Sequence, residues 1–151
     1  MYNLDNIIPQ KPPMKVIDRV ISFENEIVHA QAEITAEHLF YDATIDGIPH
    51  WVAVEIMAQT AAVYGKLNLD DTSEEPKIAF LMSIRNYKTE VTKYDVGMVL
   101  DVYAECIMLD NGVSAFEAKI EVDGQEMASI KINAYQPQND EQAEAVLSRK
   151  D

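Results

Sequence analysis

The alternation of apolar and polar residues predicts one or two helical turns and two strands in the first part of the chain. Residues 4–9 have room for such turns before the prolines of residues 9–13 force an extended backbone. β-branched and aromatic residues then recur over 16–23, and the polar residues 24–26 suit a turn. From 27 to 35 apolar and polar positions alternate, which indicates a half-buried strand.

Residues 36–48 indicate a loop with large apolar side chains, and a helical pattern follows it. From Pro49 onward the residues are apolar on nearly every face of a helix, so this helix should be buried. Pro49 suits an early helical position and Gly65 the C-terminal end, which gives a helix of about 16 residues. Only three polar residues interrupt the apolar run, namely Glu55, Gln59 and Thr60.

Four strand-like runs follow an acidic linker at 68–76. They cover 78–91 with a break near Asn86, 99–109, 113–122 and 126–135. Asn-Gly at 111–112 and Asp-Gly at 123–124 favour tight hairpin turns, so the last three runs should form an antiparallel meander. One face of a flat sheet cannot cover a helix that is apolar all round. The sheet must therefore curve around the helix, or a second copy of the chain must cover the rest.

The size and composition fit one folded α+β domain. The chain has 151 residues and 17.0 kDa, of which 48% are hydrophobic and 25% charged, close to the average of globular proteins. We expect a single domain over residues 1–137 and a flexible polar tail over 138–151, whose only helical tendency lies at 143–147.

The net charge and the cysteine content limit which partners the protein can bind and in which compartment it can reside. Twelve basic against 26 acidic residues give a net charge of −14, which opposes binding to nucleic acid or anionic lipid. No apolar run is long enough to span a membrane, and the N-terminus does not have the pattern of a secretion signal. The single cysteine, Cys106, cannot form an internal disulfide or join other cysteines around zinc. We therefore expect a cytoplasmic protein, and the sequence indicates no metal or other cofactor.

Glu55 is the most informative candidate for chemistry because it lies inside the apolar helix. Burying a carboxylate costs several kcal/mol unless the group is paired, hydrogen-bonded or protonated. Gln59 lies one helical turn further on the same face and is expected to hydrogen-bond to Glu55. Such a pair could be purely structural, or it could hold a protonated acid in a site.

The three histidines differ in their surroundings. His29 occupies a polar position of an alternating strand, which predicts a solvated side chain. His38 precedes apolar residues in a loop, which suits either a structural histidine or a neutral imidazole acting as a base. At the helix start, the backbone N–H groups of His50 and Trp51 could polarise a carbonyl oxygen, although His50 could also simply cap the helix. Base, acid and oxyanion donor together could abstract a proton beside a carbonyl and expel a leaving group.

Several motifs resemble the hotdog-fold 3-hydroxyacyl-acyl-carrier-protein dehydratases over residues 7 to 135. They are Ile-Pro-Gln-Lys-Pro-Pro-Met at 8–14 with Ile-Asp-Arg-Val at 17–20, Gly-Ile-Pro at 47–49 with Glu-Ile-Met-Ala-Gln at 55–59, and Asn-Tyr-Lys at 86–88 with Asp-Val-Gly at 95–97. Tyr41 occupies the position of the family's catalytic histidine, and the usual His-Phe-Pro-Gly segment is absent. His-Leu-Phe at 38–40 and Pro-His-Trp at 49–51 instead resemble a divergent branch associated with aryl-polyene biosynthesis.

The resemblance implies a hotdog fold, in which a curved antiparallel sheet wraps around one long buried helix. It also implies dehydration of a 3-hydroxyacyl thioester to the trans-2-enoyl thioester, in fatty-acid-like or aryl-polyene biosynthesis. His38 would take the α-proton, Glu55 would protonate the departing hydroxyl, and His50, Trp51 and Gln59 would position the substrate. In this family the histidine and glutamate of one site come from different protomers, so a homodimer or a larger oligomer of dimers is expected, or a heterodimer with a paralogue.

The implied partner is an acyl-carrier protein with a phosphopantetheine-linked acyl chain. Carrier proteins are acidic, and the basic residues Arg85, Lys88 and Lys93 could form a local docking patch despite the overall charge, or simply a solvated strand edge. Three other functions stay open. They are hydrolysis of an acyl thioester, acyl binding by a non-catalytic subunit, which the missing His-Phe-Pro-Gly segment motivates, and regulation by a small ligand.

Overall fold

The computed structural model describes residues 2–68 and 80–136. Most of the predicted acidic linker and the predicted C-terminal tail, with its helical tendency, lie outside these residues. The elements in chain order are η1 (Leu4–Asn6), β1 (Arg19–Glu24), β2 (Ile27–Glu33), β3 (Gly47–Pro49), α1 (Val52–Asn68), β4 (Phe80–Thr89), β5 (Lys93–Asp95), β6 (Val99–Asp110), β7 (Val113–Val122) and β8 (Gln125–Tyr135). The predicted order of two strands, one long helix and four strands is confirmed, with two further short strands, β3 and β5.

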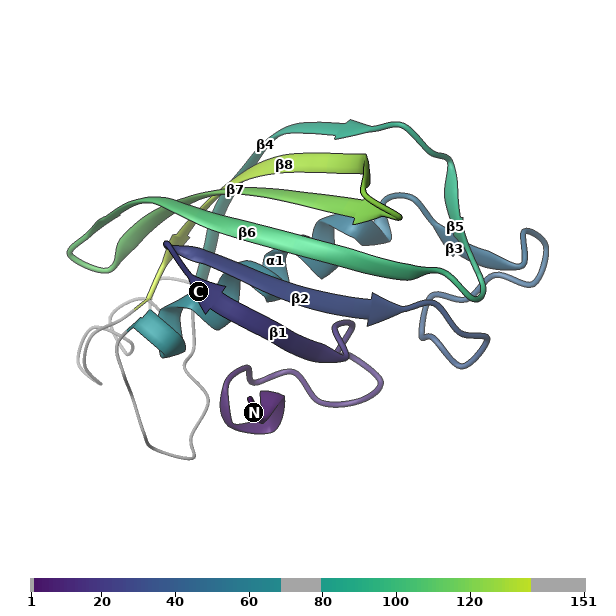
Figure 1. Ribbon diagram of the computed structural model, residues 1–151, viewed down its shortest axis with the longest axis horizontal. Helices are drawn as coiled ribbons and strands as arrows, with labels where there is room; N and C mark the ends of the chain where they lie inside the picture. Colours follow the sequence, from purple (N-terminus) through teal and green to yellow (C-terminus); the bar gives the residue numbers. More distant parts are fainter. Residues whose placement is uncertain (1, 69–79, 137–151) are drawn as a thin grey trace, which may run out of the picture.

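Six of the strands form one antiparallel sheet in the order β1-β2-β6-β7-β8-β4 (Figure 1). The predicted meander is confirmed, because β6 pairs with β7 and β7 with β8. Its two turns have positive φ at both central residues, 51° and 83° at Asn111 and Gly112, and 51° and 80° at Asp123 and Gly124. Such turns match the twist of the flanking strands, which is why Asn-Gly and Asp-Gly predicted the hairpins.

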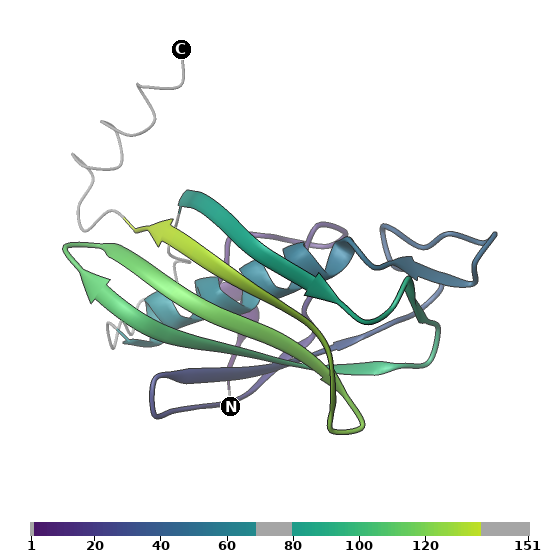
Figure 2. The ribbon, with the colours of Figure 1, turned by 90° about the horizontal axis from the view of Figure 1, so that it is seen from above.

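The helix α1 lies along one face of the curved sheet (Figure 2). It packs chiefly against β6 and β2, whose inward-facing residues are fully buried because side chains alternate between the two faces of a strand. The N-terminal segment covers a second side of α1 and buries Leu4, Ile7 and Ile8. In the parts of the chain that the structure describes, no helix is long and apolar enough to cross a membrane.

One stripe of α1 stays uncovered. Glu55 is exposed, and Val54, Ala58, Ala62 and Gly65 on the same side are only partly buried. These positions recur every three or four residues, so they form one face of the helix. The sheet and the N-terminal segment thus cover most of the apolar helix but not all of it.

Two expectations about the helix boundaries are wrong. Pro49 is the last residue of β3, which pairs with β5, and α1 begins three residues later at Val52. Proline fits there because it supplies no N–H, and a strand end needs none. Gly65 does not end the helix, which continues to Asn68. A Cβ at Gly65 would meet only the far end of the flexible Gln136 side chain, which could move aside.

The edge strand β4 has an irregular backbone and an exposed apolar surface. Its pairing with β8 shifts between Arg85 and Lys88, where Asn86 has φ +57°, so the predicted break is a β-bulge inside one strand. Three apolar side chains of β4 are exposed, namely Leu81, Met82 and Ile84. Among the described strands, nothing pairs with the outer edge of β4.

Candidate active site

Glu55 lies in the first turn of α1, at the open edge of a cavity of about 220 Å³. The expectation that the isolated chain buries this carboxyl group is wrong, because Glu55 belongs to the stripe of α1 that neither the sheet nor the N-terminal segment covers. Exposure removes the desolvation cost that a buried carboxylate would carry. The apolar character of the helix therefore did not reveal which face the chain itself covers.

The cavity beside Glu55 is lined mainly by small and apolar side chains. The helix contributes Ala58, Ala62 and Gly65, while the sheet contributes Leu81, Phe116, Ile132 and Ala134. Tyr64 also lines it, and its hydroxyl donates a hydrogen bond to the Glu26 carboxylate. Small side chains on the helix leave the space open, so an apolar chain could enter it beside the carboxyl group of Glu55.

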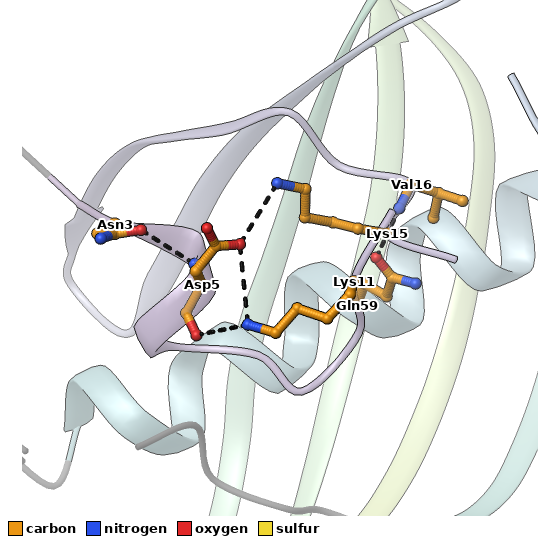
Figure 3. Close-up of polar contacts among 6 residues, drawn as sticks. All are labelled: Asn3, Asp5, Lys11, Lys15, Val16 and Gln59. Atoms are coloured by element: carbon orange, nitrogen blue, oxygen red, sulfur yellow. Dashed lines mark hydrogen bonds and ion pairs between the residues drawn. The ribbon is translucent and has the colours of Figure 1, made fainter. Parts of the chain in front are cut away.

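Gln59 connects Glu55 to the N-terminal segment. Its Nε2 donates to Glu55 Oε1 and to the Met14 carbonyl, both at 2.9 Å, while its Oε1 accepts from the Val16 N–H at 2.9 Å. Figure 3 shows the bond to Val16 from the segment in which Lys11 and Lys15 converge on Asp5. The predicted bond between Gln59 and Glu55 is confirmed. Because Gln59 is only 1% exposed and all its polar groups are engaged, it holds Glu55 and has no free group for a substrate.

The side chain of His38 makes one hydrogen bond, to a backbone N–H of its own loop. Its Nδ1 accepts from the Phe40 N–H at 3.0 Å, and its buried Nε2 has no partner among the described residues. Burial lowers the pKa of His38 below its ordinary value, although Asp18 acts in the opposite direction, so the neutral imidazole is favoured. No hydrogen bond or ion pair joins His38 to Glu55 within the described chain.

Of the two backbone donors predicted at the start of α1, one is engaged and one is free. The N–H of His50 donates to the Thr92 carbonyl at 3.1 Å, so the expectation that it is available as an oxyanion donor is wrong. The N–H of Trp51 has no hydrogen-bond partner in the described residues. The Trp51 ring is half exposed and meets the Phe40 ring edge-on at 5.4 Å, and Phe40 lies 6.1 Å from the His38 ring. Aromatic contacts thus bring His38 close to the helix start.

The side chain of His50 has a partner that the sequence did not indicate. Its Nδ1 lies 3.0 Å from the hydroxyl of Tyr87, which in turn lies 2.9 Å from the carbonyl oxygen of His50. The two rings are nearly parallel, with centroids 5.9 Å apart. Tyr87 is 37 residues away in the sequence and follows the bulge of β4, so only the strand pairing brings it to the helix start.

The predicted basic patch is divided between two surfaces. Arg85 and Lys88 are exposed on β4, where Arg85 is opposite Lys131 of the neighbouring strand β8. Lys93 lies on β5, where it forms an ion pair with Asp95 at 2.7 Å and donates to the Ile45 carbonyl at 2.7 Å. The structure therefore groups Arg85 and Lys88 with Lys131 and gives Lys93 a structural role.

One long helix wrapped by a curved antiparallel sheet defines a protein of the hotdog fold, and here a carboxyl group lies at the edge of its cavity. Comparison with known families narrows this class. The family model of the ApeP-like dehydratases (ApeP dehydratase) matches residues 2–147, so the chain belongs to this family.

Curated relatives agree with the family. The chain is similar to the 3-hydroxyacyl-acyl-carrier-protein dehydratase FabZ of Lactococcus lactis subsp. cremoris, with 28% identity over 119 residues that cover 78% of this chain and 81% of the relative. It is also similar to FabZ of Streptococcus pneumoniae, with 27% identity over 131 residues that cover 85% and 91%. The family and these relatives indicate dehydration as the reaction class.

Solved structures confirm the fold. A chain of the dehydratase heterocomplex ApeI:P from Xenorhabdus doucetiae superposes with a TM-score of 0.86 at 24% identity, covering 97% of this chain and 98% of that one. A mutant thioesterase from Pseudomonas aeruginosa superposes with a TM-score of 0.62 at 14% identity, covering 80% of each chain. The predicted hotdog fold is thus confirmed, and thioesterases share it.

Proposed function

We propose that this chain dehydrates a 3-hydroxyacyl thioester, presented by an acyl-carrier protein, as one subunit of a hotdog dimer. The observation that carries the proposal is Glu55, which Gln59 holds at the edge of an apolar cavity. The acyl chain would occupy this cavity, with the hydroxyl-bearing carbon beside Glu55. Membership in the ApeP-like dehydratase family and the names of the FabZ relatives support this reaction.

The chemistry requires one proton donor and one proton acceptor. An imidazole takes the proton from the α-carbon, and the electrons of that C–H bond form the new double bond. The β-hydroxyl leaves with the proton of Glu55 as water, and proton transfer from imidazolium to carboxylate restores the site. His38 is the sequence-based candidate for this imidazole, and its neutral form supports a place in the site. The free N–H of Trp51 is suited to the thioester oxygen as negative charge develops there.

A second subunit would complete this site. In the described chain, the Glu55 carboxylate has Gln59 as its hydrogen-bond partner and no histidine. The exposed stripe of α1 lies on the same cavity as Leu81 of β4, and the outer edge of β4 is unpaired among the described strands. Pairing of β4 with the edge strand of a second hotdog subunit would cover these surfaces and bring an imidazole of that subunit towards Glu55.

Charge favours a subunit other than a second copy. A homodimer would double the net charge of −14, whereas a less acidic paralogue would reduce the repulsion. The ApeI:P complex, whose chain this fold resembles, is described as a heterocomplex. The exposed residues Arg85 and Lys88, with Lys131 beside them, would then face an acidic carrier protein.

The test uses purified protein, alone and mixed with a hotdog paralogue, and a 3-hydroxyacyl thioester on a carrier protein. Formation of the enoyl product is expected, and Glu55→Gln should lower turnover at least a hundredfold. The matched control is Glu24→Gln, because Glu24 is also exposed but lies on β1. Unchanged turnover in Glu55→Gln would contradict the assignment of the acid.

Two other functions give different results in the same assay. A thioesterase would release free thiol without enoyl product, and the hotdog thioesterases of similar fold motivate this measurement. A non-catalytic subunit, consistent with a Glu55 that contacts no histidine in the described part of its own chain, would raise the activity of a paralogue even when it carries Glu55→Gln.

A further inference from the structure

His50 lies just before α1 and His38 lies in the loop before β3, and their hydrogen bonds favour opposite tautomers. A neutral imidazole carries its proton on one ring nitrogen only, and the bond made by the other nitrogen decides which. The nitrogen without a proton is the one that can accept a proton from a substrate. The inference below rests on the proposed dehydration and concerns which histidine takes the proton.

For His38 the assignment follows from a backbone donor. The Phe40 N–H donates to Nδ1 at 3.0 Å, so Nδ1 carries no proton in the neutral ring. Nε2 then carries it, and this nitrogen is buried without a partner among the described residues. Neutral His38 therefore carries a buried N–H at Nε2 and has no free lone pair there.

For His50 the assignment follows from the hydroxyl of Tyr87. This hydroxyl has one hydrogen and lies 2.9 Å from the His50 carbonyl oxygen and 3.0 Å from Nδ1, while the nearby Thr89 hydroxyl donates to the Val91 carbonyl. A carbonyl can only accept, so the hydroxyl donates to it and must accept from Nδ1. This is the only arrangement that satisfies both contacts. Nδ1 carries the proton, and Nε2 of His50 keeps its lone pair.

The fold fixes the positions of both His50 and Tyr87. The backbone of His50 is fixed because its N–H donates to Thr92 and its carbonyl accepts from Ala53, at 3.1 and 3.0 Å. The bulge of β4 at Asn86 directs the Tyr87 side chain to the helix start, and bulges commonly redirect side chains beside active sites. Tyr87 lies on the strand whose free edge would pair with a second subunit.

We propose that His50, and not His38, accepts the α-proton of the substrate, and that Tyr87 is a positioning residue that keeps the proton on Nδ1 of His50. The C–H electron pair forms the double bond, the proton moves to Nε2, and the hydroxyl leaves with the proton of Glu55. His38, whose Nε2–H is buried, takes no part in the proton transfer. The tautomer of each of these two histidines thus decides which of them can act as the base.

The tautomers are measurable without any activity. In the full chain labelled with ¹⁵N-histidine, long-range ¹H–¹⁵N correlations at about pH 8, above the ordinary histidine pKa, distinguish the two protonated nitrogens. We expect the Nδ1–H form for His50 and the Nε2–H form for His38. Tyr87→Phe should shift His50 towards the Nε2–H form. The matched control is Tyr103→Phe, because Tyr103 stacks on His29 at 4.4 Å on another part of the sheet, and it should leave His50 unchanged.

Turnover then tests the role. His50→Ala and His50→Gln should each lower kcat at least a hundredfold, and Tyr87→Phe at least tenfold with little change in KM. Tyr103→Phe should retain wild-type kcat. An Nε2–H tautomer for His50, or full turnover of a folded His50→Gln variant, would overturn the inference while the dehydration itself stands. No enoyl product from the wild-type chain, alone or with a paralogue, would instead overturn the proposed function and the role of His50 with it.

Discussion

Replacement of Gln59 by leucine should destabilise the fold through one buried backbone group. The Val16 N–H is buried and, among the described residues, donates only to Gln59 Oε1, at 2.9 Å. Leucine fills a similar volume but leaves this N–H unpaired, which costs about 1–3 kcal/mol. The other two partners lose less, because Met14 is 56% exposed and Glu55 is exposed, so water can replace the amide. We therefore expect a loss of about 2–3 kcal/mol in the free energy of unfolding.

Thermal and urea unfolding followed by circular dichroism measure this loss. For a chain of 151 residues, it corresponds to a fall in Tm of about 5–10 °C. The protein concentration is kept constant, because association of subunits would itself raise Tm. The matched control is Gln125→Leu at the exposed start of β8, with an expected change within about 0.5 kcal/mol.

A second comparison separates stability from chemistry. Glu55→Gln keeps the bonds of Gln59 to Met14 and Val16, so its stability should stay within about 0.5 kcal/mol of wild type. If Gln59→Leu were as stable as wild type, the connection between helix and N-terminal segment would not depend on this amide, and the reasoning from buried hydrogen bonds would be refuted.

Two further predictions concern acid stability and subunit pairing. The pKa of folded His38 is lowered by burial, so below its ordinary value of 6.5 the unfolded chain binds the proton more readily. Stability should fall as the pH drops through 6.5 towards the folded pKa, and urea titrations at several pH values should show a weaker slope for His38→Gln. Ile84→Lys should prevent β4 from pairing with a second hotdog subunit. Light scattering after size exclusion measures this association. Ile21→Lys, on the opposite edge strand, should associate like wild type, and loss of association in Ile21→Lys alone would place the interface on β1.

Local patterns predicted the elements that depend on neighbouring residues. The meander followed from Asn-Gly and Asp-Gly, because these pairs adopt positive φ at low cost. The bond between Gln59 and Glu55 followed from helical spacing alone. The short strands β3 and β5 were missed because three residues carry no periodic pattern, and their pairing joins segments that are distant in the sequence.

Contacts distant in sequence decided the surroundings of the candidate site residues. The sequence proposed Glu55 and His38 as candidates, but the exposure of Glu55 depends on which side of α1 the sheet covers. The pairing of His50 with Tyr87 depends on the register of β4 and on its bulge. A sequence cannot supply such information, because no local preference links the two residues.

The sequence by itself determined the order of elements, the two tight hairpins, the apolar helix and the family motif around Glu55. These features follow from backbone preferences and side-chain periodicity within a few residues. Only the tertiary structure decided which stripe of the helix stays open, where β4 lies in the sheet and which groups hydrogen-bond to His38 and His50. These depend on hydrogen bonds and packing between segments that the chain brings together only when the sheet closes around the helix.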